Sequence, residues 1–326
     1  MKNIFCMLLT SVIFTGAEFA LAQQPAKIPH IGILTTFSPS VISARIDGFR
    51  QGLRELGYVE GKNIVIEWRS ADGNNDRLPA LAAELVGLKV DVILSPGPTA
   101  TRAFKDATST IPIVMAQDTD PVGSGFVASL ARPGGNITGL ATLAPEIGGK
   151  QLELLKEIVP KLSRVAVIGN STVPGDAQAL RETVLAAGAY EIYLRYLDIL
   201  DPKDLETTFR AAAKGRADGL LVLGNPYLNA QRKQVVDLAV QHRLPATYTR
   251  PEYIDAGGLM YYGTNYADLF RRAVTYVDKI LKGAKPGDLP IEQPKKFELI
   301  INLKAAKQIG LTIPPSALAR ADRVIK

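Results

Sequence analysis

Residues 93–101, with the sequence ILSPGPTAT, join an apolar segment to a helical pattern through small and turn-forming side chains. The start of a helix offers unpaired backbone N–H groups and the positive end of the helix dipole, so a loop of small residues there could bind an anion. The hydroxyls of Ser95, Thr99 and Thr101 would add hydrogen-bond donors. Thr99 is also a good N-cap, so local capping explains the same residues.

Residue types that usually carry catalysis or bind metals are scarce. The only two histidines, His30 and His242, form no H-E-x-x-H or other closely spaced ligand pair. The sequence has no G-x-S-x-G motif, no Walker loop and no complete G-x-G-x-x-G motif after a strand. Gly123-Ser124-Gly125 is the nearest match and lacks the third glycine. We therefore expect a protein that is not an enzyme and that holds no metal or cofactor.

The first 22 residues have the pattern of a secretory signal peptide. Lys2 precedes an apolar run over residues 4–14, and residues 20–22 (ALA) match an A-x-A cleavage site. The run is too short to remain as a membrane-spanning helix. The single cysteine, Cys6, lies inside the run and away from the position of a lipid-attachment cysteine. We expect cleavage after Ala22 and a mature periplasmic protein without a disulfide or lipid anchor.

The composition is that of a soluble globular protein, with 47% apolar and 21% charged residues. The formal net charge is +6, but basic residues such as Arg181, Arg210 and Lys214 are scattered over helical patterns without interleaved aromatic residues. This distribution does not favour nucleic-acid binding. A mature chain of about 300 residues can bury a sufficient core without disulfides, and its length favours two lobes. We expect a monomer.

Apolar β-branched runs alternate with helical periodicity along the chain. The first series has expected strands at 30–35, 63–69, 90–95 and 111–116, with helices at 46–56, 78–88 and 99–107. The second has strands at 164–169, 191–197, 217–223 and 244–248, with helices at 177–187, 205–213 and 231–242. Each series has the βαβαβαβ order of a parallel sheet covered by helices on both faces.

The two series also match in detail, which indicates an internal repeat. Residues 90–98 (VDVILSPGP) correspond to 217–226 (ADGLLVLGNP), and 134–139 (GGNITG) correspond to 257–263 (GGLMYYG). Two similar lobes form a cleft between them, and ligands of such sheets bind beyond the carboxyl ends of the strands. We expect the two glycine-rich segments to be crossovers between the lobes, with glycine providing hinge freedom.

A series of short motifs is specific when taken in order. They are FRQGLRELGY (49–58), EGKN (60–63), RLPALAA (77–83), TIPIV (110–114), DPVG (120–123), LARPGGN (130–136), INLK (301–304) and LTIPP (311–315). With them, nearly all of the mature chain resembles the periplasmic substrate-binding proteins of ABC importers, in the branch grouped with tryptophan and tyrosine importers.

The resemblance implies an α/β fold of two Rossmann-like lobes with parallel sheets, joined by three hinge crossovers, as in type I periplasmic binding proteins. It also implies a permease and an ATPase as partners. We expect lobe one at 23–139 plus 264–289, and lobe two at 140–263 plus 290–326, with a helix at 266–281 and the third crossover near 290–298. A repressor with the same core would need a DNA-binding helix-turn-helix where this chain has a signal sequence.

The loops at the strand ends supply the candidate ligand-binding residues. Asp120 could pair with an ammonium group, or it could cap a helix that begins at Pro121. Tyr261 and Tyr262 could contact the ligand or pack between the lobes. Aromatic surfaces with one anion site and one acid suit an amino acid or an aromatic carboxylate. An exported sensor of the same fold and a periplasmic enzyme are the alternatives. The candidates are Phe37, Ser38, Ser95, Thr99, Thr101, Asp120, Asn170, Asn225, Tyr227 and Tyr248.

Overall fold

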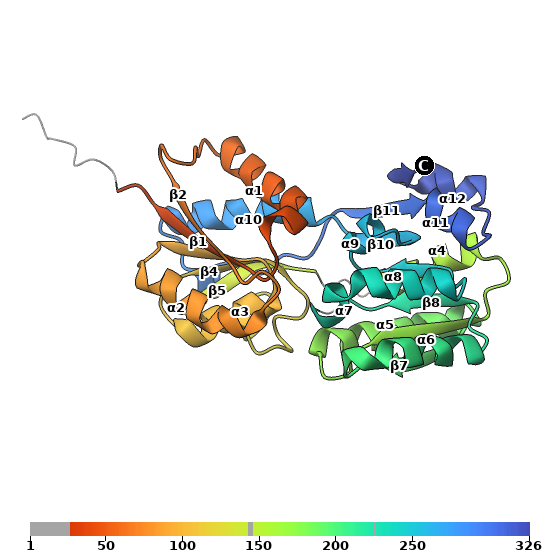
Figure 1. Ribbon diagram of the computed structural model, residues 1–326. Helices are drawn as coiled ribbons and strands as arrows, with labels where there is room; N and C mark the ends of the chain where they lie inside the picture. The colour runs from red at the N-terminus through yellow and green to blue at the C-terminus, as the bar shows by residue number, and fades with distance from the viewer. Residues whose placement is uncertain (1–26, 143–145, 225) are drawn as a thin grey trace, which may run out of the picture.

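The computed structural model describes residues 27–142, 146–224 and 226–326, which form two lobes placed side by side (Figure 1). The predicted signal peptide lies outside the described residues. Within the described ranges, no helix combines the length and apolar character that a membrane span requires.

The first lobe is built on a five-stranded parallel sheet with the order β2-β1-β3-β4-β5. Its strands are β1 (His30–Thr35), β2 (Val65–Ser70), β3 (Val92–Ser95), β4 (Ile113–Asp118) and β5 (Ile137–Ala141). Its helices are α1 (Ser43–Glu55), α2 (Leu78–Gly87), α3 (Pro98–Ala107) and α10 (Tyr266–Leu281). Every residue of β3 and β4 is buried, because helices cover both faces of the sheet.

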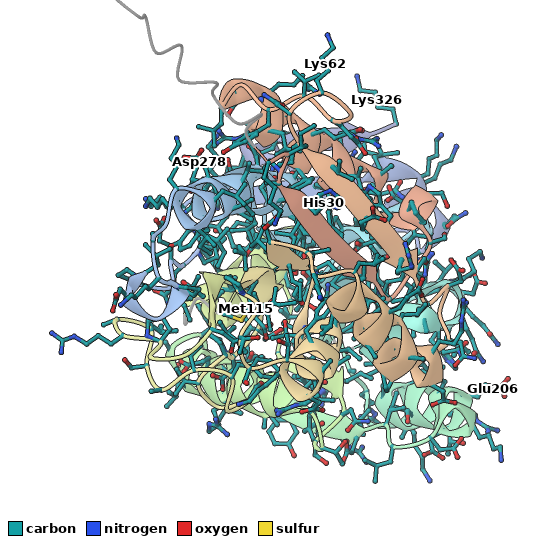
Figure 2. All side chains as sticks on the ribbon, turned by 90° about the vertical axis from the view of Figure 1, so that its left-hand side faces the viewer. His30, Lys62, Met115, Glu206, Asp278 and Lys326 are labelled. Carbon is teal, nitrogen blue, oxygen red and sulfur yellow. The ribbon has the colours of Figure 1, made fainter. Side chains whose placement is uncertain are left out.

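Helices α1 and α10 lie together on one face of this sheet, and α2 and α3 lie on the other (Figure 1). Glycine allows the close approach of α1 to α10, because a Cβ atom on Gly48 would lie 2.3 Å from the carbonyl oxygen of Ala267. Figure 2 looks onto this lobe and shows Met115 of β4 in the interior, whereas Lys62 extends from the margin.

The second lobe is built on a seven-stranded sheet with the order β12-β11-β10-β9-β8-β6-β7. Its strands are β6 (Arg164–Gly169), β7 (Tyr193–Asp198), β8 (Gly219–Val222), β9 (Ala246–Tyr248), β10 (Met260–Thr264), β11 (Phe297–Asn302) and β12 (Arg323–Ile325). Its helices are α4 (Glu146–Ile158), α5 (Pro174–Ala189), α6 (Leu205–Lys214), α7 (Pro226–Ala230), α8 (Arg232–Gln241), α9 (Glu252–Asp255), α11 (Leu303–Gln308) and α12 (Pro315–Arg320).

The chain passes between the lobes at three places, as the predicted fold class requires. It passes after β5 to reach α4, between β10 and α10, and between the 3₁₀ turn Pro286–Asp288 and β11. Glu292 forms a parallel bridge with Leu140, so the first and third passages are adjacent. All strand pairs are parallel except β10 with β11, because β11 returns from the first lobe against the direction of β10. The predicted α/β fold with two lobes is confirmed.

The glycine-rich segments are not the crossovers that we expected, and this prediction is wrong. Residues 137–141 and 260–264 instead form the fifth strand of the repeat in each lobe, β5 and β10. Ile137 and Leu140 are buried core residues. Burial of their apolar side chains in the sheet stabilises the fold, whereas an exposed hinge would leave them in water. Gly139 is needed for close packing, because it has φ +130° and its Cβ would lie 2.2 Å from the Met115 carbonyl oxygen. The residue limits of the lobes stay a prediction.

Candidate ligand-binding cleft

The carboxyl ends of the central strands of both lobes meet at the boundary between the lobes. The first lobe contributes the ends of β1, β3 and β4, and the second contributes the ends of β8, β9 and β10. Parallel sheets place their loops at this edge, where ligands of doubly wound folds bind. Two cavities lie there, and each is lined by residues of both lobes.

The larger cavity has a volume of about 700 Å³ including its open mouth. Its wall combines apolar groups with hydroxyls, two carboxylates and one guanidinium. The lining residues are Thr119, Thr142, Ile147, Gly148, Gln151, Asp176, Ala179, Glu182, Thr183, Leu223, Gly224, Thr249, Arg250, Gly263, Thr264 and Tyr266.

The smaller cavity has a volume of about 480 Å³ on the same basis and lies mainly against the first lobe. It includes the start of helix α3, where backbone N–H groups and the helix dipole favour negative charge. Its lining residues are Thr35, Thr36, Phe37, Ile42, Arg45, Pro96, Gly97, Pro98, Thr99, Gln117, Asn229 and Arg250.

Arg250 lines both cavities and follows β9 closely. Its side chain passes over Gly224, where an added Cβ would lie 3.3 Å from Arg250 Cγ and Nε. Its guanidinium carbon lies 5.6 Å from the centre of the Tyr266 ring. Among the described residues, this guanidinium has no hydrogen-bond or ion-pair partner. A ligand carboxylate could therefore bind it by paired, charge-assisted hydrogen bonds.

The charge of a second arginine at the cleft is already balanced by a carboxylate. Arg45 of α1 forms an ion pair with Glu252 of α9, which joins the two lobes, and each side chain is only 8% exposed. The Arg45 guanidinium also lies 4.7 Å from the centre of the Tyr266 ring. Burial, followed by the nearby positive charge of Arg250, lowers the pKa of Arg45 to about 10. Because Glu252 balances Arg45, the positive charge of Arg250 is left for a ligand.

The hydroxyls of the 93–101 loop divide into two groups. Thr99 lines the smaller cavity together with Gly97 and Pro98. Ser95 and Thr101 are buried behind the loop, with their hydroxyl oxygens 2.7 Å apart. Thr101 Oγ1 donates to Asp118 Oδ2 at 2.8 Å, and burial raises the pKa of Asp118 to about 7. In this geometry Ser95 and Thr101 support the start of α3 from behind.

Asp120 does not cap a helix, because residues 121–126 form a turn and the helix expected at Pro121 is absent. Its Oδ1 accepts a hydrogen bond of 2.8 Å from the Gly123 N–H. Asp120 is not among the lining residues of either cavity. Its hydrogen bond with Gly123 is explained by the turn. A role of Asp120 in ligand binding stays a prediction.

The other predicted residues are dispersed. Phe37 lines the smaller cavity, and Ser38 Oγ lies 3.0 Å from Ser40 Oγ. Asn170 is buried and its Oδ1 accepts from the Thr172 N–H at 2.9 Å. Tyr248 is buried and stacks on Tyr253 with 4.7 Å between the ring centres.

The structure describes two of the four remaining candidate residues, Tyr261 and Tyr262. Asn225 lies outside the described residues, and so does the side chain of Tyr227. Tyr261 is buried and donates from its hydroxyl to the Thr264 carbonyl oxygen at 2.6 Å. Tyr262 stacks on Phe297 with 6.1 Å between the ring centres. Neither of these two tyrosines is among the residues that line the cleft cavities.

The sequence analysis missed Arg250, Gln117, Asn229 and Asp176. The expected strand 111–116 stops one residue before Gln117, which belongs to β4. The expected helix 177–187 begins one residue after Asp176, which lies in the first turn of α5. Arg250 could have been found by its position, because it follows a strand of the repeat as closely as the small loop residues do.

Two lobes of mainly parallel sheet with a charged, partly apolar cleft at the strand ends define a two-lobed solute-binding protein. The family model described as ABC transporter substrate binding protein matches residues 30–325. The chain belongs to this family, which confirms the class of protein predicted from the motifs.

Individual relatives agree with this class. The tyrosine-binding protein of Clostridioides difficile strain R20291 is 26% identical over 290 residues, which are 87% of this chain and 82% of that protein. A conserved domain protein from Vibrio cholerae O1 biovar El Tor is 30% identical, with a TM-score of 0.83 over 91% of this chain and 100% of that one. The ABC domain from Streptococcus pneumoniae in complex with L-Trp is 25% identical, with a TM-score of 0.83 over 91% and 99%.

Proposed function

We propose that this protein captures an aromatic amino acid between its lobes and delivers it to the permease and ATPase of an ABC importer. The guanidinium of Arg250 carries this proposal, because it has no partner among the described residues and Arg250 lines both cavities of the cleft. The start of α3 adds a second group that favours an anion. Together they would hold the carboxylate of the ligand.

The larger cavity would receive the side chain of the ligand. Its wall is mainly apolar with a few placed polar groups, as in small-molecule sites. Ile147, Leu223 and Tyr266 supply the apolar and aromatic contact, and Asp176 and Glu182 supply acceptors in the same wall. The relatives named for tyrosine and crystallised with L-Trp support an aromatic ligand.

The proposal includes the cellular location. We propose that the signal peptide is removed after Ala22 and that the mature protein works as a periplasmic monomer. The family of ABC substrate-binding proteins and the residue pattern of 1–22 support this proposal. It binds its ligand without changing it.

Titration calorimetry with L-tyrosine, L-tryptophan and L-phenylalanine tests the role of Arg250. The protein is unfolded and refolded beforehand to remove any bound ligand. Arg250→Gln should weaken binding by about 30-fold to several thousand-fold, which corresponds to roughly 2–5 kcal/mol for a buried charge pair. The exposed Arg210 on α6 provides the matched control, and Arg210→Gln should leave affinity unchanged. Equal affinity in wild type and Arg250→Gln would remove the guanidinium from the site.

A further inference from the structure

Two amide side chains at the smaller cavity are buried without hydrogen-bond partners for their oxygens. Gln117 is 5% exposed and Asn229 is 2% exposed, and both line this cavity. Gln117 Oε1 and Asn229 Oδ1 find no partner among the described residues. Buried polar atoms in native proteins are almost always paired, so two unpaired acceptors in one cavity point to a donor that the ligand brings.

The two amides come from opposite lobes. Gln117 is the penultimate residue of β4 in the first lobe, and Asn229 lies in α7 of the second. A single ligand group can contact both oxygens only while the lobes enclose it. Binding to both amides therefore depends on closure of the two lobes as well as on a donor group in the ligand.

The charge of the cavity indicates which part of the ligand meets these oxygens. Arg250 and the start of α3 supply donors and positive charge, and none of the described residues that line this cavity is acidic. In an amino acid the ammonium group is bonded to the carbon next to the carboxylate. A carboxylate on Arg250 thus places an ammonium group nearby, and the two amide oxygens are buried acceptors at that cavity that have no partner within the described ranges.

We infer that Gln117 and Asn229 accept hydrogen bonds from the α-ammonium of the ligand and so select amino acids over the corresponding carboxylic acids. This inference rests on the proposed function. Neutral amide oxygens satisfy an ammonium group without placing a carboxylate beside Arg250, which would compete with the ligand carboxylate.

A comparison of two ligands tests the selection. The amino acid that binds more tightly, L-tyrosine or L-tryptophan, is compared with the analogue that lacks its amino group. These analogues are 3-(4-hydroxyphenyl)propionate and indole-3-propionate, respectively. Wild type should prefer the amino acid by at least about tenfold, the factor expected for one hydrogen bond to a charged group. Gln117→Met and Asn229→Leu keep the side-chain volume and remove the oxygen. Each should weaken amino-acid binding by about 10-fold to 100-fold and change des-amino binding by less than about threefold.

The controls separate folding from recognition. Gln234→Met, on the exposed face of α8, should change neither affinity, and thermal melts without ligand verify that each variant is folded. If both ligands weaken equally in the variants, or if wild type binds them equally, this inference is overturned and the proposed function stands. If neither aromatic amino acid binds to wild type, the proposed function fails and this inference fails with it.

Discussion

At the scale of single residues, the cleft is defined by how its charges are balanced. Arg45 has a carboxylate partner in Glu252, whereas Arg250 has no hydrogen-bond or ion-pair partner in the part of the chain that the structure describes. Both guanidinium groups lie near the ring of Tyr266. Burial is the main cause of the lowered pKa of Arg45, and an anion beside Arg250 would relieve the second cause, which is repulsion by the Arg250 charge. We therefore assign the guanidinium of Arg250 to the ligand carboxylate.

Asp120→Asn should leave both ligand affinity and stability nearly unchanged. The side-chain oxygen of asparagine can accept the same hydrogen bond from the Gly123 N–H, and asparagine is as suitable in such a turn as aspartate. Calorimetric titration of L-tyrosine or L-tryptophan, with a denaturant melt of each protein, measures the two quantities. An affinity loss of about 30-fold or more with normal stability would restore Asp120 as an ammonium partner.

Asp118 should make the protein less stable as the pH rises. Burial raises its pKa to about 7 in the folded state, above the ordinary value of about 3.9 in the unfolded chain. Between these values the folded state binds the extra proton, so stability falls with increasing pH. Asp118→Asn removes this cost and retains an acceptor for Thr101.

Urea unfolding at pH 5 and pH 8 measures this effect. Relative to wild type, Asp118→Asn should gain about 2–3 kcal/mol of unfolding free energy between the two pH values. A constant difference between variant and wild type at both pH values would mean that Asp118 is ionised throughout.

At the scale of elements, burial explains which structures could be predicted from sequence. The apolar runs of β1 and β6 predict the observed bounds of these strands, because a strong hydrophobic pattern reports directly which residues are buried. Strands β5 and β10 were mistaken for hinges, because glycine signals freedom in a loop and close packing in a sheet. Whether a glycine is packed depends on its neighbour across the sheet, as Met115 shows for Gly139.

The ligand site was less predictable than the fold for a related reason. Thr99 and Phe37 could be placed at the cleft because they follow strands of the repeat. Arg250 and Asn229 acquire their meaning only from what lies beside them in space. Ser95 and Thr101 have the expected residue types, but their hydroxyls are engaged inside the lobe: Ser95 contacts Thr101, and Thr101 donates to the buried Asp118 of the next strand. Single-sequence patterns do not report such tertiary partners.

Gly48→Ala should destabilise the first lobe by about 1–3 kcal/mol, the usual cost of overpacking. The added Cβ would lie 2.3 Å from the backbone of Ala267 and would force α1 away from α10. Gly87 at the end of α2 has no atom within 4 Å of the position that a Cβ would take, so Gly87→Ala is the matched control. Denaturant melts should show the control equal to or more stable than wild type. Equal losses in both variants would contradict tight packing of α1 on α10.

At the scale of the whole molecule, the Arg45–Glu252 ion pair fastens the lobes to each other. Glu252→Gln leaves a buried guanidinium without its counterion, which costs about 3–5 kcal/mol in comparable sites. We expect a more open ligand-free protein, with a larger radius of gyration by small-angle scattering, and weaker ligand binding.

A double variant provides the control for this pair. Arg45→Met combined with Glu252→Leu removes both charges, and it should recover much of the stability lost in Glu252→Gln, because replacing both partners with apolar groups is often neutral. Unchanged scattering in Glu252→Gln, or a double variant as unstable as the single one, would contradict a clasp between the lobes.

The central claim is that the cleft binds an aromatic amino acid and leaves it unchanged, and a thermal melt of the refolded mature protein tests it most directly. A ligand at a hundred times its dissociation constant should stabilise the fold by about 2.7 kcal/mol, a shift of roughly 5–10 °C for a chain of this size. We predict this shift with L-tyrosine or L-tryptophan, and mass spectrometry should recover the amino acid intact. Absence of a shift with both amino acids, or conversion of the stabilising compound into a product, would contradict the account.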